Sequence, residues 1–174
     1  MIGLYHGRSS PPKREWGGRL PVALIFPERM EYALSTLGWQ VVYRLLASRG
    51  DVVVERFFWD PSSPRPRSVD SGRDLGLFPI LLFSLNFEGD FPTMLRIIKD
   101  ADLPLRSGDR ADWPLVMVGG PIAFLNPFPI LPACDALRVG EAEAGLEAVF
   151  DILVSTWIRR EDKLSALERI APLD

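Results

Sequence analysis

The distribution of apolar residues along the chain predicts a sheet of parallel strands. Short runs of mostly apolar residues are separated by longer segments in which apolar and polar positions are mixed. The runs cover residues 22–26, 52–58, 79–83, 115–118 and 136–139. Strands that are apolar at nearly every position are typical of a parallel sheet that is covered on both faces. We therefore interpret each run as a buried strand of one sheet.

The mixed segments between these runs predict helices and loops. Apolar residues recur at helical spacing in residues 32–48, 91–100, 141–158 and 163–170. Gly50 supplies a stop for the first of these helices, and Pro92 lies near the first turn of the second, where a missing N–H is tolerated. Residues 60–76 and 103–113 are rich in Pro, Ser, Arg and Asp and predict loops. We expect the basic stretch 65–73 to be solvated.

Alternating strands and helices, joined by right-handed crossovers, favour one architecture. It is an α/β fold of the flavodoxin or Rossmann kind: a doubly wound, mainly parallel five-stranded sheet with helices on both faces. We divide the chain into a flexible arm (residues 1–19), the α/β domain (residues 20–158) and a linker with a short helix (residues 159–174). His6 lies in the arm, where a solvated role is favoured over a ligand role.

Composition narrows the class of protein. Hydrophobic residues make up 47% of the 174 residues, which is enough for a sizeable core. The net charge of −3 gives no basic footprint for nucleic acid or a membrane surface, and no apolar run is long enough to span a bilayer. The single cysteine, Cys134, excludes an internal disulfide and an all-cysteine metal site within this chain. A reducing, cytoplasmic location is the default expectation.

Candidate site residues follow the strands, because ligands of open α/β sheets bind outside the carboxyl ends of the strands. The pair Gly119-Gly120 allows a sharp turn or the close approach of a ligand, and both interpretations stay open. Ser84 and Asn86 carry groups that can bind a polar ligand, but capping of the next turn is favoured. We expect Glu141 to lie in the first turn of a helix, where its carboxylate meets free N–H groups.

The order of these segments is more specific than any one of them. From about Leu20 to Val154, the sequence resembles the N-terminal cobalamin-binding-like domain of radical SAM proteins. The likeness is carried by VALIFP (22–27), LGWQVVYRLL (37–46), residues 52–57, LFSLNFE (82–88), PLVMVGGP (114–121) and DALRVGEAE (135–143).

The resemblance implies cobalamin across the carboxyl edge of the sheet. The cofactor-binding residues that it implies are Pro27, Ser84, Leu85, Asn86, Gly119, Gly120, Pro121, Gly140 and Glu141. Apolar contacts would come from Phe87, Phe124 and Leu125. The D-x-H-x-x-G motif, which supplies a histidine to cobalt in methionine-synthase-type relatives, is absent, and Asn86 replaces the leucine of the family's S-x-L motif. Cobalamin would therefore bind without a protein histidine ligand. No residue of the chain is assigned a catalytic or a metal-binding role.

The resemblance also implies a longer parent protein. The motif C-x-x-x-C-x-x-C occurs nowhere in these residues, so a 4Fe–4S cluster and S-adenosylmethionine would belong to a C-terminal radical SAM domain beyond Asp174. That domain would be the partner of this one, which by itself would not be catalytic.

Two functions remain open for such a domain. The first is an accessory domain that binds a cofactor or substrate, and the second is a structural module with an empty pocket. In the second, Phe91, Phe124 and Phe128 would form the surface between the domains. A free-standing receiver-like or flavodoxin-like protein is disfavoured because no phosphoacceptor constellation is evident.

Overall fold

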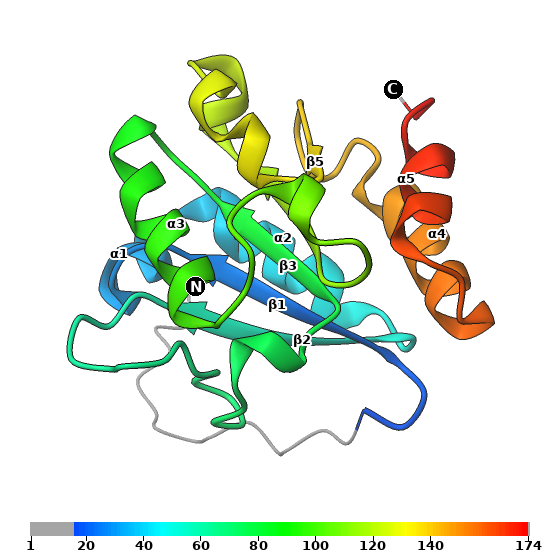
Figure 1. Ribbon diagram of the computed structural model, residues 1–174, viewed down its shortest axis with the longest axis horizontal. Helices are drawn as coiled ribbons and strands as arrows, with labels where there is room; N and C mark the ends of the chain where they lie inside the picture. The colour runs from blue at the N-terminus through cyan, green and yellow to red at the C-terminus, as the bar shows by residue number, and fades with distance from the viewer. Residues whose placement is uncertain (1–15, 174) are drawn as a thin grey trace, which may run out of the picture.

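A computed structural model describes residues 16–173 of the protein (Figure 1). Five parallel strands form one sheet in the order β2-β1-β3-β4-β5, which confirms the predicted fold class. The strands are β1 (Leu20–Phe26), β2 (Val52–Phe58), β3 (Ile80–Ser84), β4 (Leu115–Gly119) and β5 (Ala136–Leu137). Because the order reverses between β1 and β3, the switch point of the sheet lies between these two strands.

The α-helices cover both faces of the sheet. They are α1 (Met30–Ser35), α2 (Leu37–Ser48), α3 (Phe91–Asp100), α4 (Leu146–Arg159) and α5 (Lys163–Ile170). In Figure 1, α3 lies in front of the sheet and α2 behind it. None of the helices in the described part of the chain has the length and apolar character needed to cross a membrane.

Alternate residues of each strand supply the two layers of the core. Leu24, Leu82 and Met117 pack in the layer that contains buried residues of α2, α4 and α5. Ile25 and Phe83, one residue further along their strands, pack in the layer that contains the buried residues of α3. Burial on both faces explains why the strands are apolar at nearly every position.

Two predicted helices begin or continue differently from the expectation. Residues 32–48 form two helices, because Thr36 has an extended backbone and its hydroxyl donates to the Tyr32 carbonyl at 2.9 Å. The helix predicted from residue 141 begins at Leu146, because Gly145 precedes it with φ +122°. The prediction that Glu141 lies in a helical first turn was therefore wrong.

Two connections contain short 3₁₀ turns in place of α-helices. The crossover from β2 to β3 contains η1 (Leu75–Leu77), and the connection from β4 to β5 contains η4 (Pro121–Phe124) and η5 (Phe128–Ala133). Two further turns are η2 (Glu88–Asp90), before α3, and η3 (Ser107–Asp109), before β4. Both helix-free connections lead away from carboxyl ends of strands, so they bring irregular backbone to that edge.

The β2–β3 crossover is pinned to the sheet rather than simply solvated. Asp70 accepts a hydrogen bond from the backbone N–H of Arg56 at 2.6 Å and pairs with its guanidinium. Arg73 pairs at 3.0 Å with Glu55, a buried carboxylate of β2. The expectation that the stretch 65–73 is solvated was therefore wrong for Arg73, whose guanidinium also lies over the ring of Trp16.

A buried ionic cluster closes the amino-terminal end of the sheet. Asp135, just before β5, pairs with Arg110 at 3.1 Å and with Lys163 at 3.0 Å, and accepts from the N–H of Val116 at 2.7 Å. The three charged side chains are nearly inaccessible to solvent. Lys163 begins α5, so the cluster fastens α5 to the sheet.

Trp16 of the predicted arm and α5 of the predicted linker pack against the α/β domain. Trp16 packs edge-on against Phe78 at 5.1 Å between ring centroids. α5 packs against α4, and Ala166 is fully buried. Residues 1–15 of the predicted arm, including His6, lie outside the described residues.

Candidate functional site

The loops that follow β3 and β4 meet at the carboxyl edge, as the sequence predicted. The N–H of Leu85 donates to the Gly119 carbonyl at 2.9 Å, and the N–H of Ile122 donates to the Leu85 carbonyl at 3.3 Å. Gly120, at φ +105°, would place a Cβ only 2.5 Å from the Leu85 carbonyl oxygen. The second glycine of the pair is therefore required for the packing of the two loops.

Asp90 organises the turn between β3 and α3. Its buried carboxylate accepts from the N–H of Asn86 at 2.7 Å and from that of Phe87 at 3.4 Å. Burial raises the pKa of Asp90, although these hydrogen bonds oppose the shift, and the charge of Glu28 after β1 raises it further. Sequence reasoning assigned capping to Ser84 and Asn86, and it missed Asp90, whose one signal was its place before Pro92.

Arg138 joins the candidate residues of β4 to those that follow β5. It lies nearest to the positions where a Cβ would stand on Gly119 and on Gly140, 3.9 Å away in each case. Its guanidinium donates to the carbonyls of Val139, at 2.7 Å, and Ala144, while its Nε is buried without a hydrogen-bond partner. Sequence reasoning missed Arg138, since an arginine at the end of a strand is no distinctive signal.

The remaining predicted residues differ in their exposure. Pro27 is buried at the end of β1, and Leu85 has no exposed surface. Pro121 and Glu141 are exposed, and Ser84 is half-buried. The candidate residues thus share the carboxyl edge, but only part of the set faces solvent.

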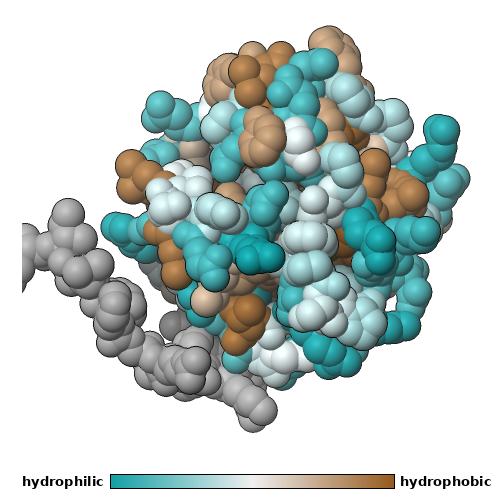
Figure 2. Space-filling model, turned by 90° about the vertical axis from the view of Figure 1, so that its left-hand side faces the viewer, coloured by the Kyte–Doolittle hydropathy of each residue, from teal (hydrophilic) through white to brown (hydrophobic). Residues whose placement is uncertain are grey.

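Large apolar side chains are exposed along the same edge. Phe128 is 75% exposed, Phe124 67%, Leu125 58% and Phe87 52%. Figure 2 views this edge, and brown and tan apolar atoms gather at its top, over η4 and η5. Phe91, which the sequence placed on the same surface, is buried in the core, so this part of the expectation was wrong.

The chemistry of the edge can be tested against cobalamin. The described residues contain no histidine, and the place where a side chain would stand on Gly120 is filled by the protein's own backbone. A Cβ added to Gly119 or to Gly140 would meet no atom closer than 3.9 Å, apart from those of the adjacent residues in the chain. The residues therefore fit a group lying on the outside of this edge, and they do not fit one inserted between the loops after β3 and β4.

No group of three or more His, Cys, Asp or Glu side chains within residues 16–173 is arranged to hold a metal ion. A cavity of about 650 Å³ lies at the carboxyl ends of β1 and β2, and none of the nine predicted residues lines it. Cys134 is buried, and burial raises the pKa of its thiol to about 11.

Comparison with known proteins gives one family match. A model of the family described as "Radical SAM proteins, N-terminal" matches residues 38–174. No curated protein matches the chain. The matched residues contain most of the sheet, every predicted site residue except Pro27, and both glycines of the β4 turn.

Proposed function

Because the chain belongs to the family of radical SAM N-terminal domains, we propose that it packs its carboxyl edge against a radical SAM domain of the same parent protein. The observation that carries this proposal is the exposed apolar rim formed by Phe87, Phe124, Leu125 and Phe128. We call these four residues the apolar rim. Aromatic side chains gathered on one exposed surface are typical of interfaces.

The local backbone supports a docking role for this rim. Phe124 ends η4, Leu125 follows it, and Phe128 begins η5; this segment leaves the sheet directly after the Gly119-Gly120 turn. The hydrogen bond from the N–H of Ile122 to the Leu85 carbonyl, at 3.3 Å, and the buried side chain of Ile130 hold this segment in place. The exposed rings are thus carried on anchored backbone, which lowers the entropy lost on docking.

A binding experiment with the separately produced radical SAM domain of the parent protein tests this function. We expect the double variant Phe124→Ser/Phe128→Ser to weaken binding by about tenfold or more, because buried aromatic residues dominate interface energies. The matched control is Ile158→Ser/Leu164→Ser, which changes two exposed residues of α4 and α5 that are 63% and 59% accessible. Equal weakening by the two double variants, or no measurable binding of the native pair, would contradict the proposal.

Cobalamin bound without a protein histidine ligand is the second proposal for this edge. It is supported by the resemblance of the ordered segments and by the open approach to Gly119 and Gly140. When bound, a corrinoid would supply cobalt-centred chemistry, while this chain would contribute glycine backbone and the nearby Arg138 guanidinium to its surroundings.

Visible spectroscopy of the chain with hydroxocobalamin tests the second proposal. We expect a saturable spectral change that is lost in Gly119→Leu and retained in Gly38→Leu, a helix position with open space around it. Gly120 is unsuitable as the test site, because its substitution disturbs the Leu85 backbone. A dissociation constant near 100 μM would already mean weak binding, so the absence of any spectral change at about 100 μM cobalamin would overturn this proposal.

A further inference from the structure

A hollow that none of the candidate site residues lines lies beneath the β2–β3 crossover. A cavity of about 650 Å³ that opens to solvent is bordered by this crossover, by the turn between β1 and α1, and by α3. Its volume falls within the range of about 300–1,000 Å³ that small-molecule sites occupy. The hollow exists because the crossover, which runs as the teal loop below α3 in Figure 1, contains no α-helix to fill the space beside α3.

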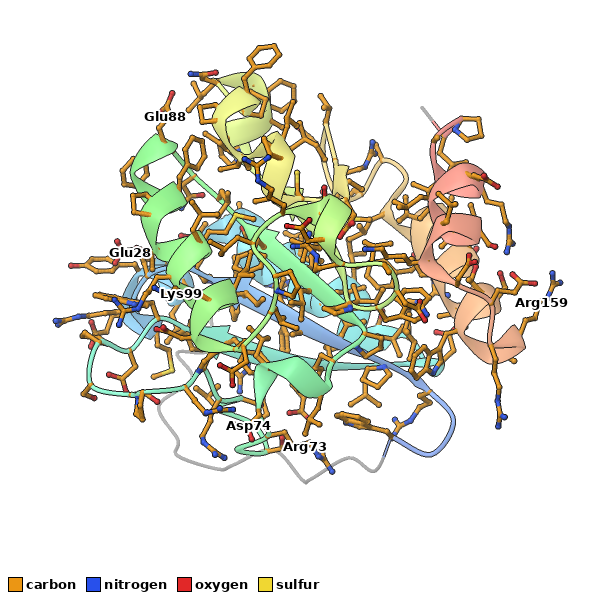
Figure 3. The ribbon with its side chains drawn as sticks, viewed as in Figure 1. Glu28, Arg73, Asp74, Glu88, Lys99 and Arg159 are labelled. Carbon is orange, nitrogen blue, oxygen red and sulfur yellow. The ribbon has the colours of Figure 1, made fainter. Side chains whose placement is uncertain are left out.

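Hydrogen bonds to the sheet hold the walls of this cavity. The N–H of Val69 donates to the carbonyl of Arg56 at 3.0 Å, and the N–H of Trp59 donates to the carbonyl of Glu28 at 3.1 Å. The N–H of Leu75 donates to the Pro66 carbonyl at 3.1 Å. Figure 3 labels Glu28 at this end of the sheet and Arg73 and Asp74 on the crossover. The cavity is therefore preformed, which favours binding because little backbone must become ordered.

The apolar part of the wall comes from side chains on three elements. Met30 follows β1, Phe58 and Trp59 end β2 and begin the crossover, and Ile97 lies on α3. Ile97 and Phe58 are largely covered by the core, and Trp59 is half-buried. An apolar or planar body in the cavity would find aromatic and aliphatic contacts.

The polar part of the wall contains three guanidinium groups. Arg29 has no carboxylate within 4 Å among the described residues, whereas Arg65 pairs with Asp102 and Arg67 pairs with Asp74 at 3.1 Å. The arginines of these two pairs are 53% and 56% exposed. Exposed ion pairs contribute only about 0–1 kcal/mol, so a ligand can exchange with either carboxylate at low cost.

The carboxylates in the wall are largely engaged by the chain itself. Asp60 accepts from the N–H of Ser62 at 2.9 Å and from its hydroxyl at 2.6 Å, and Asp100 pairs with Arg96 at 2.7 Å. Glu31 is the remaining carboxylate, and it lies on exposed α1. The groups available to a ligand are therefore mainly the arginine donors.

We propose that this cavity binds a small organic oxyanion, a phosphate monoester or carboxylate joined to a planar apolar body. The oxyanion bonds with Arg29 and with guanidinium groups released from their surface pairs, since arginine matches the geometry of both anions. The planar body lies against Trp59 and the apolar wall. The cavity is separate from the apolar rim. A negative result for ligand binding in the cavity would therefore not affect the proposed docking function, and a negative result for docking would not affect the cavity.

Calorimetric titration of the chain with three probes tests the site. The probes are AMP, indole-3-acetate and adenosine: the first two combine a ring with an anion, and the third has the ring alone. We expect saturable binding of AMP or of indole-3-acetate, and the preferred anion then identifies the ligand class as a phosphate or a carboxylate. We expect adenosine to bind at least about tenfold more weakly, since charge-assisted hydrogen bonds contribute about 1.5–3 kcal/mol each.

A pair of arginine variants locates the binding. We expect Arg29→Gln to weaken binding of the anionic probe by about fivefold or more. Arg44 is an exposed residue of α2 outside the cavity wall, so we expect Arg44→Gln to leave this binding unchanged. Backbone NMR shifts caused by the probe should concentrate in residues 29–31, 58–69 and 97–100. Equal binding of adenosine, equal effects of the two variants, or no binding at about 5 mM probe would each overturn the proposal.

Discussion

The two ends of the sheet use their polar and apolar side chains in opposite ways. At the amino-terminal end, Asp135 is buried with two cationic partners, Arg110 and Lys163, and the cluster joins β5 to α5. At the carboxyl end, the buried Asp90 has no ion-pair partner among the described residues, and it accepts from backbone N–H groups. The buried carboxylate has cationic partners at one end and none among the described residues at the other.

Apolar residues show the same contrast. The large side chains of the apolar rim are between 52% and 75% exposed at the carboxyl end. Exposing such side chains forgoes about 1.5–3 kcal/mol for each one that could be buried. A fold tolerates this arrangement at one end when that end is reserved for contacts with another molecule. The amino-terminal end therefore holds the domain together, whereas the apolar rim at the carboxyl end stays exposed, as the proposed docking requires.

The largest expected effect comes from breaking the amino-terminal cluster. Asp135→Ala leaves Arg110 and Lys163 buried without their carboxylate, so we expect a loss of about 3–5 kcal/mol in the free energy of unfolding. Urea denaturation measures the loss. Asp109→Ala, a change in an exposed residue of η3, serves as the control and should alter stability little. A loss below about 1 kcal/mol for Asp135→Ala would contradict the structural role of the cluster.

The two glycines of the pair are expected to differ in their effect on stability, because only Gly120 is required for the packing of the loops at the carboxyl end. Gly120→Ala forces a Cβ to within 2.5 Å of the Leu85 carbonyl oxygen at φ +105°, so we expect a loss of about 2–4 kcal/mol. Gly119→Ala, whose nearest neighbour is 3.9 Å away, should cost less than about 1 kcal/mol. Thermal unfolding of the two variants gives the comparison. If the two losses were equal, Gly120 would have no special role in joining the loops.

The sequence predicted the sheet and missed the groups that organise its edge. The strands from Val22 to Val118 were recognisable because a strand that is buried on both faces is apolar at nearly every position, and this pattern is visible in the sequence. Asp90 and Arg138 were missed because their partners are backbone groups within six residues of them, and the residue types at those positions do not reveal such hydrogen bonds. The cavity was missed for a related reason: it arises where an expected loop is pinned by Asp70 and Arg73, and pairing at such a distance leaves no periodic signal.

Changes in the apolar rim should have little effect on the stability of the isolated chain. Phe128→Ser removes a side chain that is 75% exposed, so we expect the free energy of unfolding to change by less than about 0.5 kcal/mol. Denaturation of the variant beside the native chain measures this change. A loss above about 2 kcal/mol would mean that the ring packs within the domain and is not reserved for a partner.

The smallest effect concerns the pH dependence of stability, and it separates the two kinds of carboxylate. The pKa of Asp90 is raised above 3.8, mainly by burial. Between 3.8 and the raised value the folded protein therefore binds more protons than the unfolded chain, and the free energy of unfolding falls as the pH rises. Asp90→Asn retains an acceptor oxygen but cannot ionise, so its curve of stability against pH should fall less steeply.

Asp162, at the N-terminus of α5, provides the opposite sign for the same measurement. The N–H and hydroxyl of Ser165 both donate to it at 2.9 Å, and these bonds lower the pKa of its carboxyl below 3.8. The stability that it contributes is present above 3.8 and is lost as the pH falls through the lowered value, so Asp162→Asn should remove a rise with pH. Urea titrations from acid to neutral pH compare both variants with the native chain. Slopes that change in the same direction would contradict the burial of an uncompensated charge at the carboxyl end, because of these two carboxylates only that of Asp90 ionises against folding.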